Sequence, residues 1–319
     1  MTSTSVRPAI AVTGLRKAFG DQVVLDGLDL TVPRGTVFSL LGANGAGKTT
    51  TVKILSTLLG ADAGDVRVAG HDVAREPDAV RAAIGVTGQF SAVDKLLTGE
   101  ENLRLMADLH HLARSERGER VAGLLRQFEL TEAADRPAAT YSGGMVRRLD
   151  LAMTLVGNPQ VIFLDEPTTG LDPRSRRTMW EIIRQLVADG VTIFLTTQYL
   201  AEADELADRI AVLDRGRVVA EGTAEELKRR IPGGHVRLRF ADEHELDAAL
   251  RVLDQAARTS DTLALRVPSD GSLRALKTLI GQLDDRAVEV EELSVHTPDL
   301  DDVFLAVTGH RRDEERTSR

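Results

Sequence analysis

The chain has 319 residues, a length that favours two domains over one, and it contains no cysteine. The absence of cysteine excludes disulfides and thiolate metal sites and fits a reducing compartment. The net charge of −9 argues against a nucleic-acid partner, because proteins that bind nucleic acids nonspecifically are usually basic. No stretch approaches the roughly 20 apolar residues that span a bilayer. We therefore expect a cytoplasmic protein unless a partner holds it at a membrane.

The first half of the chain alternates strand-like and helix-like segments. We expect residues 1–8 to be a flexible N-terminus, followed by short β-like runs from Ile10 to Leu40. Residues 48–59 have the pattern of a helix and residues 64–70 that of a strand. From about 90 to 157, apolar residues recur at a three-to-four spacing, which predicts an inserted helical subdomain.

The next segments predict buried strands and an amphipathic helix. PQVIFLDEP (159–167) and VTIFLTT (191–197) are typical of buried parallel strands, and RIAVLDRGRVVAEG (209–222) predicts further strands. SRRTMWEIIRQLVADG (175–190) predicts a helix that ends at Gly190. We therefore expect an α/β domain over residues 9–230.

Pro232, Gly233 and Gly234 predict a linker, and a second domain is expected after it. Residues 235–309 show the order β-α-β-α-β and then a last helix, which predicts a small C-terminal α+β domain of ferredoxin-like type. We find no chemical motif in it. Residues 310–319 are expected to form a flexible tail.

A phosphate-binding loop is predicted at LGANGAGKTT (41–50). Gly42, Gly47, Lys48 and Thr49 have the G-x-x-x-x-G-K-[ST] spacing, between a predicted strand and a predicted helix. Glycines let backbone N–H groups turn toward a phosphate, and the helix N-terminus adds partial positive charge. Lys48 is expected to reach the β- and γ-phosphates, and Thr49 to bind Mg²⁺. The other loop residues expected to contact the nucleotide are Asn44, Gly45, Ala46 and Thr50.

Two carboxylates follow the strand within PQVIFLDEP. Asp165 is expected to hold Mg²⁺, directly or through water, and Glu166 to act as the general base toward the attacking water. Alone, such a pair at the end of a strand is more often a turn or capping feature. After a phosphate loop in the same chain, it is the expected second half of a nucleotide site.

A second anion-binding helix end is predicted in YSGGMVRRLDLAM (141–153). Ser142 is a suitable N-cap, and Gly143 and Gly144 leave backbone donors exposed. A capped helix without a ligand is the alternative, and it would be favoured if the stretch stood alone.

In this order, the motifs from about Ile10 to Gly222 resemble those of an ATP-binding cassette (ABC) ATPase. That family has an aromatic residue that stacks on adenine, Walker A, a Gln loop, the LSGGQ signature, Walker B with its catalytic Glu, an LD loop and a switch His. The corresponding positions here are Phe19, residues 42–50, Gln89, Ser142–Gly144, Asp165 with Glu166, Asp172 and Gln198. The resemblance implies catalytic and metal-binding roles for Gln89 and a nucleotide contact for Asp172. It also implies a P-loop NTPase fold.

The finer resemblance is to the daunorubicin/doxorubicin-resistance group of drug-exporter ATPases. RRLDLAM (147–153), TTQYLAEADELADRI (196–210) and TPDLDDVFLAVTG (297–309) carry it. Departures from the general pattern are Tyr141 and Met145 in the signature, Phe19 for the usual Tyr, and Gln198 for the switch His. Because that group often has Gln at the switch position, we expect Gln198 to face the γ-phosphate.

The resemblance also implies an assembly. Two copies would form a head-to-tail homodimer, with each ATP between Walker A of one subunit and Ser142–Gly144 of the other. A separate multi-spanning membrane subunit would hold the dimer at the cytoplasmic face of the cell membrane. The expected function is MgATP hydrolysis that drives efflux of a drug. The alternatives are a regulatory nucleotide-binding protein with weak or no hydrolysis, and an ABC ATPase that serves a non-drug substrate.

Overall fold

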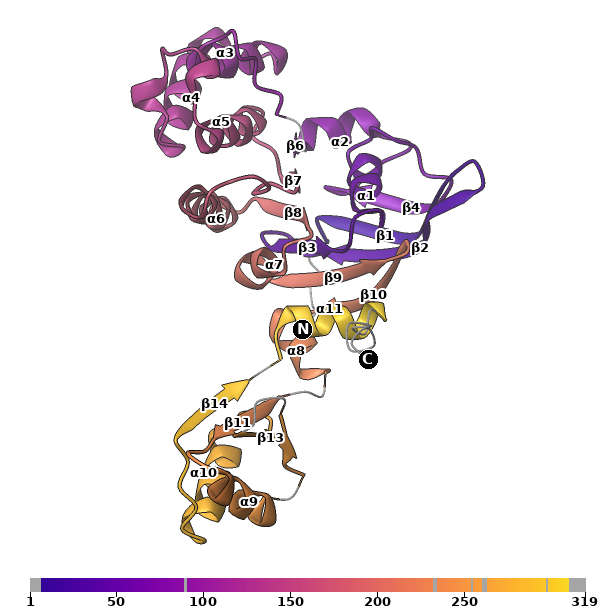
Figure 1. The fold of residues 1–319 in the computed structure, drawn as a ribbon. Coiled ribbons are helices and arrows are strands. Elements are labelled where there is room, and N and C mark those ends of the chain that lie inside the picture. Colours follow the sequence, from indigo (N-terminus) through magenta and orange to yellow (C-terminus); the bar gives the residue numbers. More distant parts are fainter. Residues whose placement is uncertain are drawn as a thin grey trace, which may run out of the picture. The chain divides into compact units, whose positions relative to one another are not determined.

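The computed structural model describes residues 7–88, 91–231, 234–253, 255–259, 263–296 and 298–309. The chain divides into two compact units, residues 1–224 and 225–319 (Figure 1). The division falls shortly before the linker expected at 232–234. Within the described ranges, no helix is both long enough and apolar enough to cross a membrane.

A six-stranded sheet forms the centre of the first unit. Its order is β10-β9-β3-β8-β7-β6; β9 to β6 run parallel and β10 is antiparallel to β9. The strands are β3 (Val37–Leu41), β6 (Ile84–Thr87), β7 (Val161–Asp165), β8 (Thr192–Thr197), β9 (Arg209–Asp214) and β10 (Arg217–Gly222). Every residue of β3, β7 and β8 is buried, as expected for parallel strands covered on both faces.

An antiparallel sheet of order β2-β1-β4-β5 packs toward one face of the central sheet. Its strands are β1 (Ile10–Phe19), β2 (Gln22–Val32), β4 (Ala63–Val68) and β5 (His71–Asp72). Helices α1 (Lys48–Leu55) and α2 (Pro77–Ala83) contribute to the same core. Helix α1 ends before the expected residue 59, because Thr57 takes a left-handed backbone conformation with φ 65° that a helix cannot continue.

Alternate residues of the central strands face two different cores. On β8, Phe194 belongs to the core shared with the antiparallel sheet, whereas Ile193 and Leu195 belong to the core on the opposite face. This period of two is the geometry of a strand with both faces buried. The opposite face is covered by α6 (Pro173–Ala188) and α7 (Leu200–Leu206), and Gly190, with φ 92°, follows α6 as expected.

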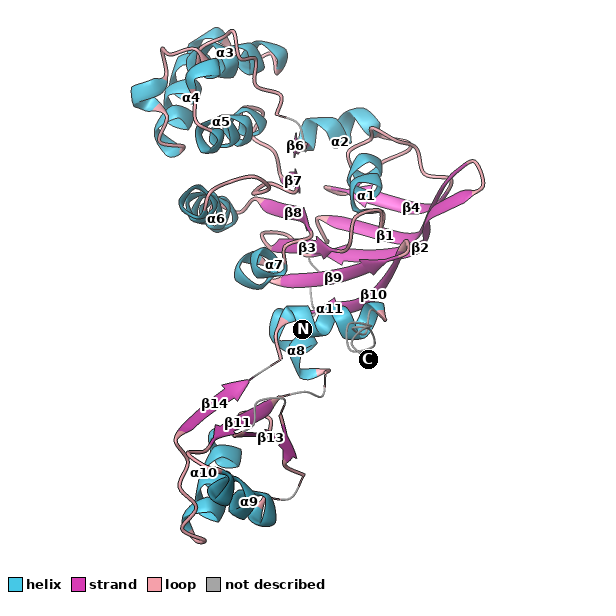
Figure 2. Cartoon of the chain, viewed as in Figure 1, coloured by secondary structure: helices cyan, strands magenta, loops and turns pink. Residues whose placement is uncertain are grey.

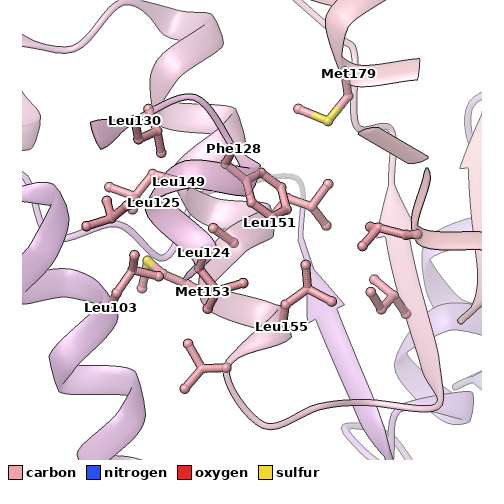
Figure 3. Close-up of a cluster of buried hydrophobic side chains, with 14 of the residues drawn as sticks. Leu103, Leu124, Leu125, Phe128, Leu130, Leu149, Leu151, Met153, Leu155 and Met179 are labelled. Atoms are coloured by element: carbon pink, nitrogen blue, oxygen red, sulfur yellow. The ribbon is translucent and has the colours of Figure 1, made fainter. Parts of the chain in front are cut away.

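Three helices lie between β6 and β7 and group together apart from the strands (Figure 2). They are α3 (Gly99–Leu109), α4 (Arg114–Gln127) and α5 (Gly143–Leu155), with 3₁₀ turns at Thr131–Ala133 and Ala138–Thr140. Figure 3 shows their apolar side chains converging, with Phe128 close to Leu151 of α5. Met179 of α6 belongs to the same cluster, so α5 is packed both against its neighbouring helices and toward the central sheet.

The second unit has its own sheet and core. Its antiparallel sheet has the order β12-β13-β11-β14, and its core includes Val236, Leu238, Leu246 and Leu279. The elements are α8 (Ala224–Arg229), whose first residue belongs to the first unit, then β11 (His235–Arg239), α9 (Glu243–Val252), β12 (Ala257–Arg258), β13 (Ala264–Pro268), α10 (Leu273–Asp284), β14 (Glu292–His296) and α11 (Leu300–Thr308). The two-residue strand β12 is absent from the order expected from the sequence, because so short a strand leaves no periodic pattern.

Candidate active site

Three neighbouring strands, β3, β8 and β7, bring the predicted motifs to one edge of the central sheet. Leu41 pairs with Thr197, and Asp165 pairs with Thr196. The backbone N–H of Glu166 donates to the Thr196 carbonyl at 3.0 Å. The phosphate loop, the two carboxylates and Gln198 therefore all follow the carboxyl ends of adjacent parallel strands, which is where open α/β sheets bind ligands.

The phosphate loop depends on two glycines. A Cβ at Gly42 would lie 2.6 Å from the carbonyl oxygen of Leu213, and a Cβ at Gly47 would lie 2.7 Å from Cδ2 of Leu25. Gly47 also has φ 113° at the N-terminus of α1, a conformation that favours glycine. No side chain caps this helix, so the N–H groups of its first turn remain available to an anion.

Lys48 is buried beneath the loop, and its side chain is 5% exposed. Its Nζ donates to the carbonyl oxygens of Gly42 at 2.8 Å and Ala43 at 3.2 Å, and lies 3.7 Å from Oε1 of Glu166. Burial lowers the pKa of the Lys48 ammonium, and the charges of Glu166 and Asp165 oppose that shift. The ammonium is therefore held against the loop whose N–H groups can bind an anion.

Asp165 is buried at the end of β7 and accepts hydrogen bonds from two threonines. Thr49 donates to Oδ2 at 3.0 Å, and the Thr196 hydroxyl donates to Oδ1. A carboxylate facing a hydroxyl offers the oxygen ligands that Mg²⁺ prefers, so Thr49 and Asp165 fit this ion. Thr196 was not predicted; its only sequence signal is its position near the end of β8, two residues before Gln198.

Glu166 has an unusual backbone conformation. Its φ of 51° is in the left-handed region, which non-glycine residues seldom adopt. The hydroxyl of Thr169, another residue missed by the sequence analysis, donates to Oε2 of Glu166 at 3.4 Å. Strained backbone of this kind persists only where surrounding contacts hold it, and it concentrates at functional sites.

A pocket of about 510 Å³ joins these groups. Its lining consists of Gln22, Val24, Asn44, Gly45, Gly47, Lys48, Thr49, Thr50, Asp165, Glu166, Thr169 and Gln198. Among the described residues, the Gln198 amide has no hydrogen-bond partner, so it can bind a ligand at this edge. The pocket thus contains most of the predicted Walker A residues, both Walker B carboxylates and Gln198. Gly42 and Ala46 belong to the loop but do not line the pocket.

Other predicted residues lie outside this pocket. Phe19 is half exposed at the end of β1, with the Lys17 ammonium 5.5 Å from its ring centroid. Asp172 is the N-cap of α6 and accepts from the N–H groups of Arg174 and Ser175, both at 3.0 Å. The position of Gln89 lies outside the described residues.

The signature residues form a separate helix end. Ser142 caps α5, and its Oγ accepts from the N–H of Met145 at 3.3 Å. A Cβ at Gly144 would lie 2.5 Å from Oγ of Ser175, so the start of α5 packs closely against the start of α6. Ser142, Gly143 and Gly144 do not line the pocket of their own chain.

Comparison with known proteins identifies the family of the chain. The ABC transporter family model matches residues 25–169. The daunorubicin resistance ATP-binding protein DrrA3 of Streptomyces coeruleorubidus is 49% identical, covering 95% of this chain and 97% of that protein. The daunorubicin/doxorubicin resistance ATP-binding protein DrrA of Streptomyces peucetius is 48% identical, covering 99% and 97%.

More distant relatives and solved structures have the same cassette. The Nod factor export ATP-binding protein I of Ralstonia nicotianae is 38% identical, covering 95% of this chain and 94% of that protein. A solved ATP-binding subunit of an ABC transporter superposes with a TM-score of 0.63 at 32% identity, covering 70% of this chain and 92% of that one. The fold of the first unit is thus the α/β P-loop NTPase fold of ABC ATPases. The chain belongs to the ATP-hydrolysing, ATP-binding subunits of ABC transporters, in the daunorubicin/doxorubicin-resistance family.

Proposed function

We propose that the chain hydrolyses MgATP at a head-to-tail homodimer interface and thereby drives efflux of a drug-like compound through a separate multi-spanning membrane subunit. The observation that carries the proposal is that one pocket contains Lys48, Thr49, Asp165, Glu166 and Gln198. A buried cation, a hydroxyl–carboxylate pair, a second carboxylate and an amide are the groups that phosphoryl transfer to water requires.

Different residues of the chain have different roles in this hydrolysis. Loop N–H groups and Lys48 bind and orient the β- and γ-phosphates, while Glu166 accepts the proton of the attacking water. Gln198 donates an N–H to a γ-phosphate oxygen. Thr49, Asp165 and Gln89 would hold Mg²⁺, which when bound neutralises charge on the phosphates.

The position of the signature supports a dimer. Ser142–Gly144 start a helix whose N-terminus can bind an anion, yet they lie outside the pocket of the same chain. A two-fold dimer would bring this helix end of one copy to the pocket of the other. The same interface would then complete the pockets of both copies. We propose that Asp172 lies at this interface and that Phe19 stacks on the adenine.

The membrane subunit and the cargo are inferred from relatives. Proteins at 46–49% identity are named for daunorubicin or doxorubicin resistance, which favours a drug-like substrate. They are ATP-binding components, so we propose that this chain also acts at the cytoplasmic face of the membrane through a membrane-embedded partner. Relatives at 38% identity are named for Nod factor export, which makes a non-drug export substrate the second candidate.

For the second unit we propose the ferredoxin-like class. Its β-α-β-β-α-β order and the strand order β12-β13-β11-β14 support this class. Its proposed role is subunit assembly, because the residues we assign to nucleotide chemistry all lie in the first unit.

The test is Glu166→Gln, with Glu205→Gln as the matched control. Glu205 is an exposed residue of α7 that pairs with Arg184, outside the pocket. Glu166→Gln should bind ATP with parental affinity, lose turnover and accumulate as an ATP-bound dimer on size-exclusion chromatography, whereas Glu205→Gln should hydrolyse ATP normally. Parental turnover in Glu166→Gln would refute the assignment. Drug efflux is tested with the same variant, expressed together with its membrane subunit, in a doxorubicin accumulation assay.

A further inference from the structure

One buried arginine donates to backbone carbonyls of the Walker B segment, residues 165–167. Arg147 lies on α5, the helix that Ser142 begins, and its side chain is 12% exposed. Its Nε donates to the Pro167 carbonyl at 2.8 Å, and its Nη2 is 3.4 Å from the Asp165 carbonyl and 3.5 Å from the Glu166 carbonyl. A single guanidinium therefore holds three consecutive carbonyl groups around the proposed catalytic base.

Asp150 holds this arginine and connects it to the segment around Gln89. Its Oδ2 accepts from Nη1 of Arg147 at 3.3 Å, and its Oδ1 accepts from the N–H of Ala92 at 3.0 Å. Nη1 of Arg147 also donates to the Gly88 carbonyl at 3.0 Å. Burial raises the pKa of Asp150 and lowers the pKa of Arg147, and the attraction between the two charges opposes both shifts. The pair is thus a buried, mutually neutralising unit in contact with residues on both sides of Gln89.

The contacts of Arg147 bear on the one strained residue of the pocket. Glu166 has φ 51°, and its N–H is held by the Thr196 carbonyl at 3.0 Å. Its own carbonyl accepts from the N–H of Thr169 at 3.3 Å and from Arg147. Left-handed backbone at a non-glycine residue relaxes unless such contacts fix it. The direction of the Glu166 side chain therefore depends on the groups that hold residues 165–167.

We propose that Arg147 is a positioning residue for Glu166, that Asp150 holds Arg147 in place, and that the pair joins the signature helix to the hydrolytic carboxylate. The inference rests on the proposed function. Ser142 and Arg147 belong to one helix, so a contact of Ser142–Gly144 with ATP in the partner subunit acts on the same rigid element that aligns Glu166 in its own subunit. Alignment matters because a misplacement of about 1 Å can lower a rate about a hundred-fold.

The first test is Arg147→Lys, with Arg148→Lys as the matched control on the same helix. Lysine keeps the charge but is a single point donor, so it cannot span the carbonyl groups that the planar guanidinium spans. Arg148 pairs with Glu129, 2.7 Å away and outside the pocket. Arg147→Lys should lower kcat by about ten- to a hundred-fold while KM and the Kd for ATP change by less than about two-fold. Arg148→Lys should keep the parental rate.

A double variant separates positioning from a general effect on the fold. If Arg147 acts through Glu166, Arg147→Lys should cause no further loss of residual hydrolysis in the Glu166→Gln background. A parental kcat in Arg147→Lys, an equal loss of ATP affinity, or an additive loss in that background would each overturn the inference. Should Arg147→Lys fail to fold, Asp150→Asn must show the same fall in kcat at constant Kd. Parental hydrolysis in Glu166→Gln alone would instead refute the proposed function, so the two failures are distinguishable.

Discussion

Gln198 should act as a neutral hydrogen-bond donor to the γ-phosphate, and Gln198→Ala removes that donor. The residue lines the pocket with Lys48 and Glu166, and among the described residues its amide has no partner that would compete with a phosphate. A hydrogen bond to a charged group contributes about 1.5–3 kcal/mol. If it forms fully only in the transition state, its loss slows turnover about ten- to a hundred-fold.

The same change should have little effect on ATP affinity and on stability. Lys48 and the N–H groups of the loop still bind the phosphates in Gln198→Ala. An amide without an internal partner contributes little to the folded state, so the free energy of unfolding should change by about 0.5 kcal/mol or less. The matched control is Gln185→Ala, because Gln185 is an exposed residue of α6 whose amide donates to Asp189.

Gln198→His tests the neutral character of the donor. A histidine near its ordinary pKa of about 6.5 gains charge as the pH falls. The hydrolysis rate of Gln198→His should therefore show a step between about pH 6 and 7.5. Single-turnover hydrolysis by the parent, Gln198→Ala and Gln198→His across this range measures both effects. An unchanged rate in the Ala variant would refute the donor role, and a step of the same size in the parent would refute the explanation of the pH dependence.

Two further predictions concern a buried carboxyl and the dimer. Glu202 is 1% exposed, and burial raises its pKa above the ordinary 4.5. Because the folded chain then binds the proton more tightly, its stability falls as the pH rises above the ordinary pKa of 4.5. Glu202→Gln stays neutral, so the Tm of this variant minus that of the parent should increase as the pH rises above 4.5, and a constant difference would contradict this. A mixture of Lys48→Ala and Ser142→Ala chains should have more ATPase activity than either variant alone, since each heterodimer has one intact composite site; no recovery in demonstrated heterodimers argues against composite sites.

The strand ends of the first unit could be predicted from the sequence. Asp165 and Gln198 each follow a run of buried apolar residues, and the loop before Lys48 follows another, so all three belong to one edge of a parallel sheet. The structure brings them into one pocket, while their chemical roles stay predictions. The position of Gln89 lies outside the described residues.

Thr196 and Arg147 could not be predicted because their contacts come from the tertiary structure. Thr196 is one of six buried residues in β8, and only its hydrogen bond to Asp165 on β7 places it in the candidate site. Arg147 lies near the start of α5, whose N-cap is exposed. An arginine at such a position ordinarily faces solvent. Its burial depends on how α5 packs against residues 165–167, which no local pattern contains.

Lys48 contacts both the phosphate loop and Glu166. Its ammonium lies 3.7 Å from Oε1 of Glu166 and donates to the Gly42 and Ala43 carbonyls, so it contacts the base and the loop together. Phosphate oxygens in the pocket attract the same ammonium more strongly, since they carry more charge than one carboxylate. We therefore expect bound phosphate to draw the Lys48 ammonium from Glu166 toward the loop, which leaves Oε1 of Glu166 free to accept a hydrogen bond from a water.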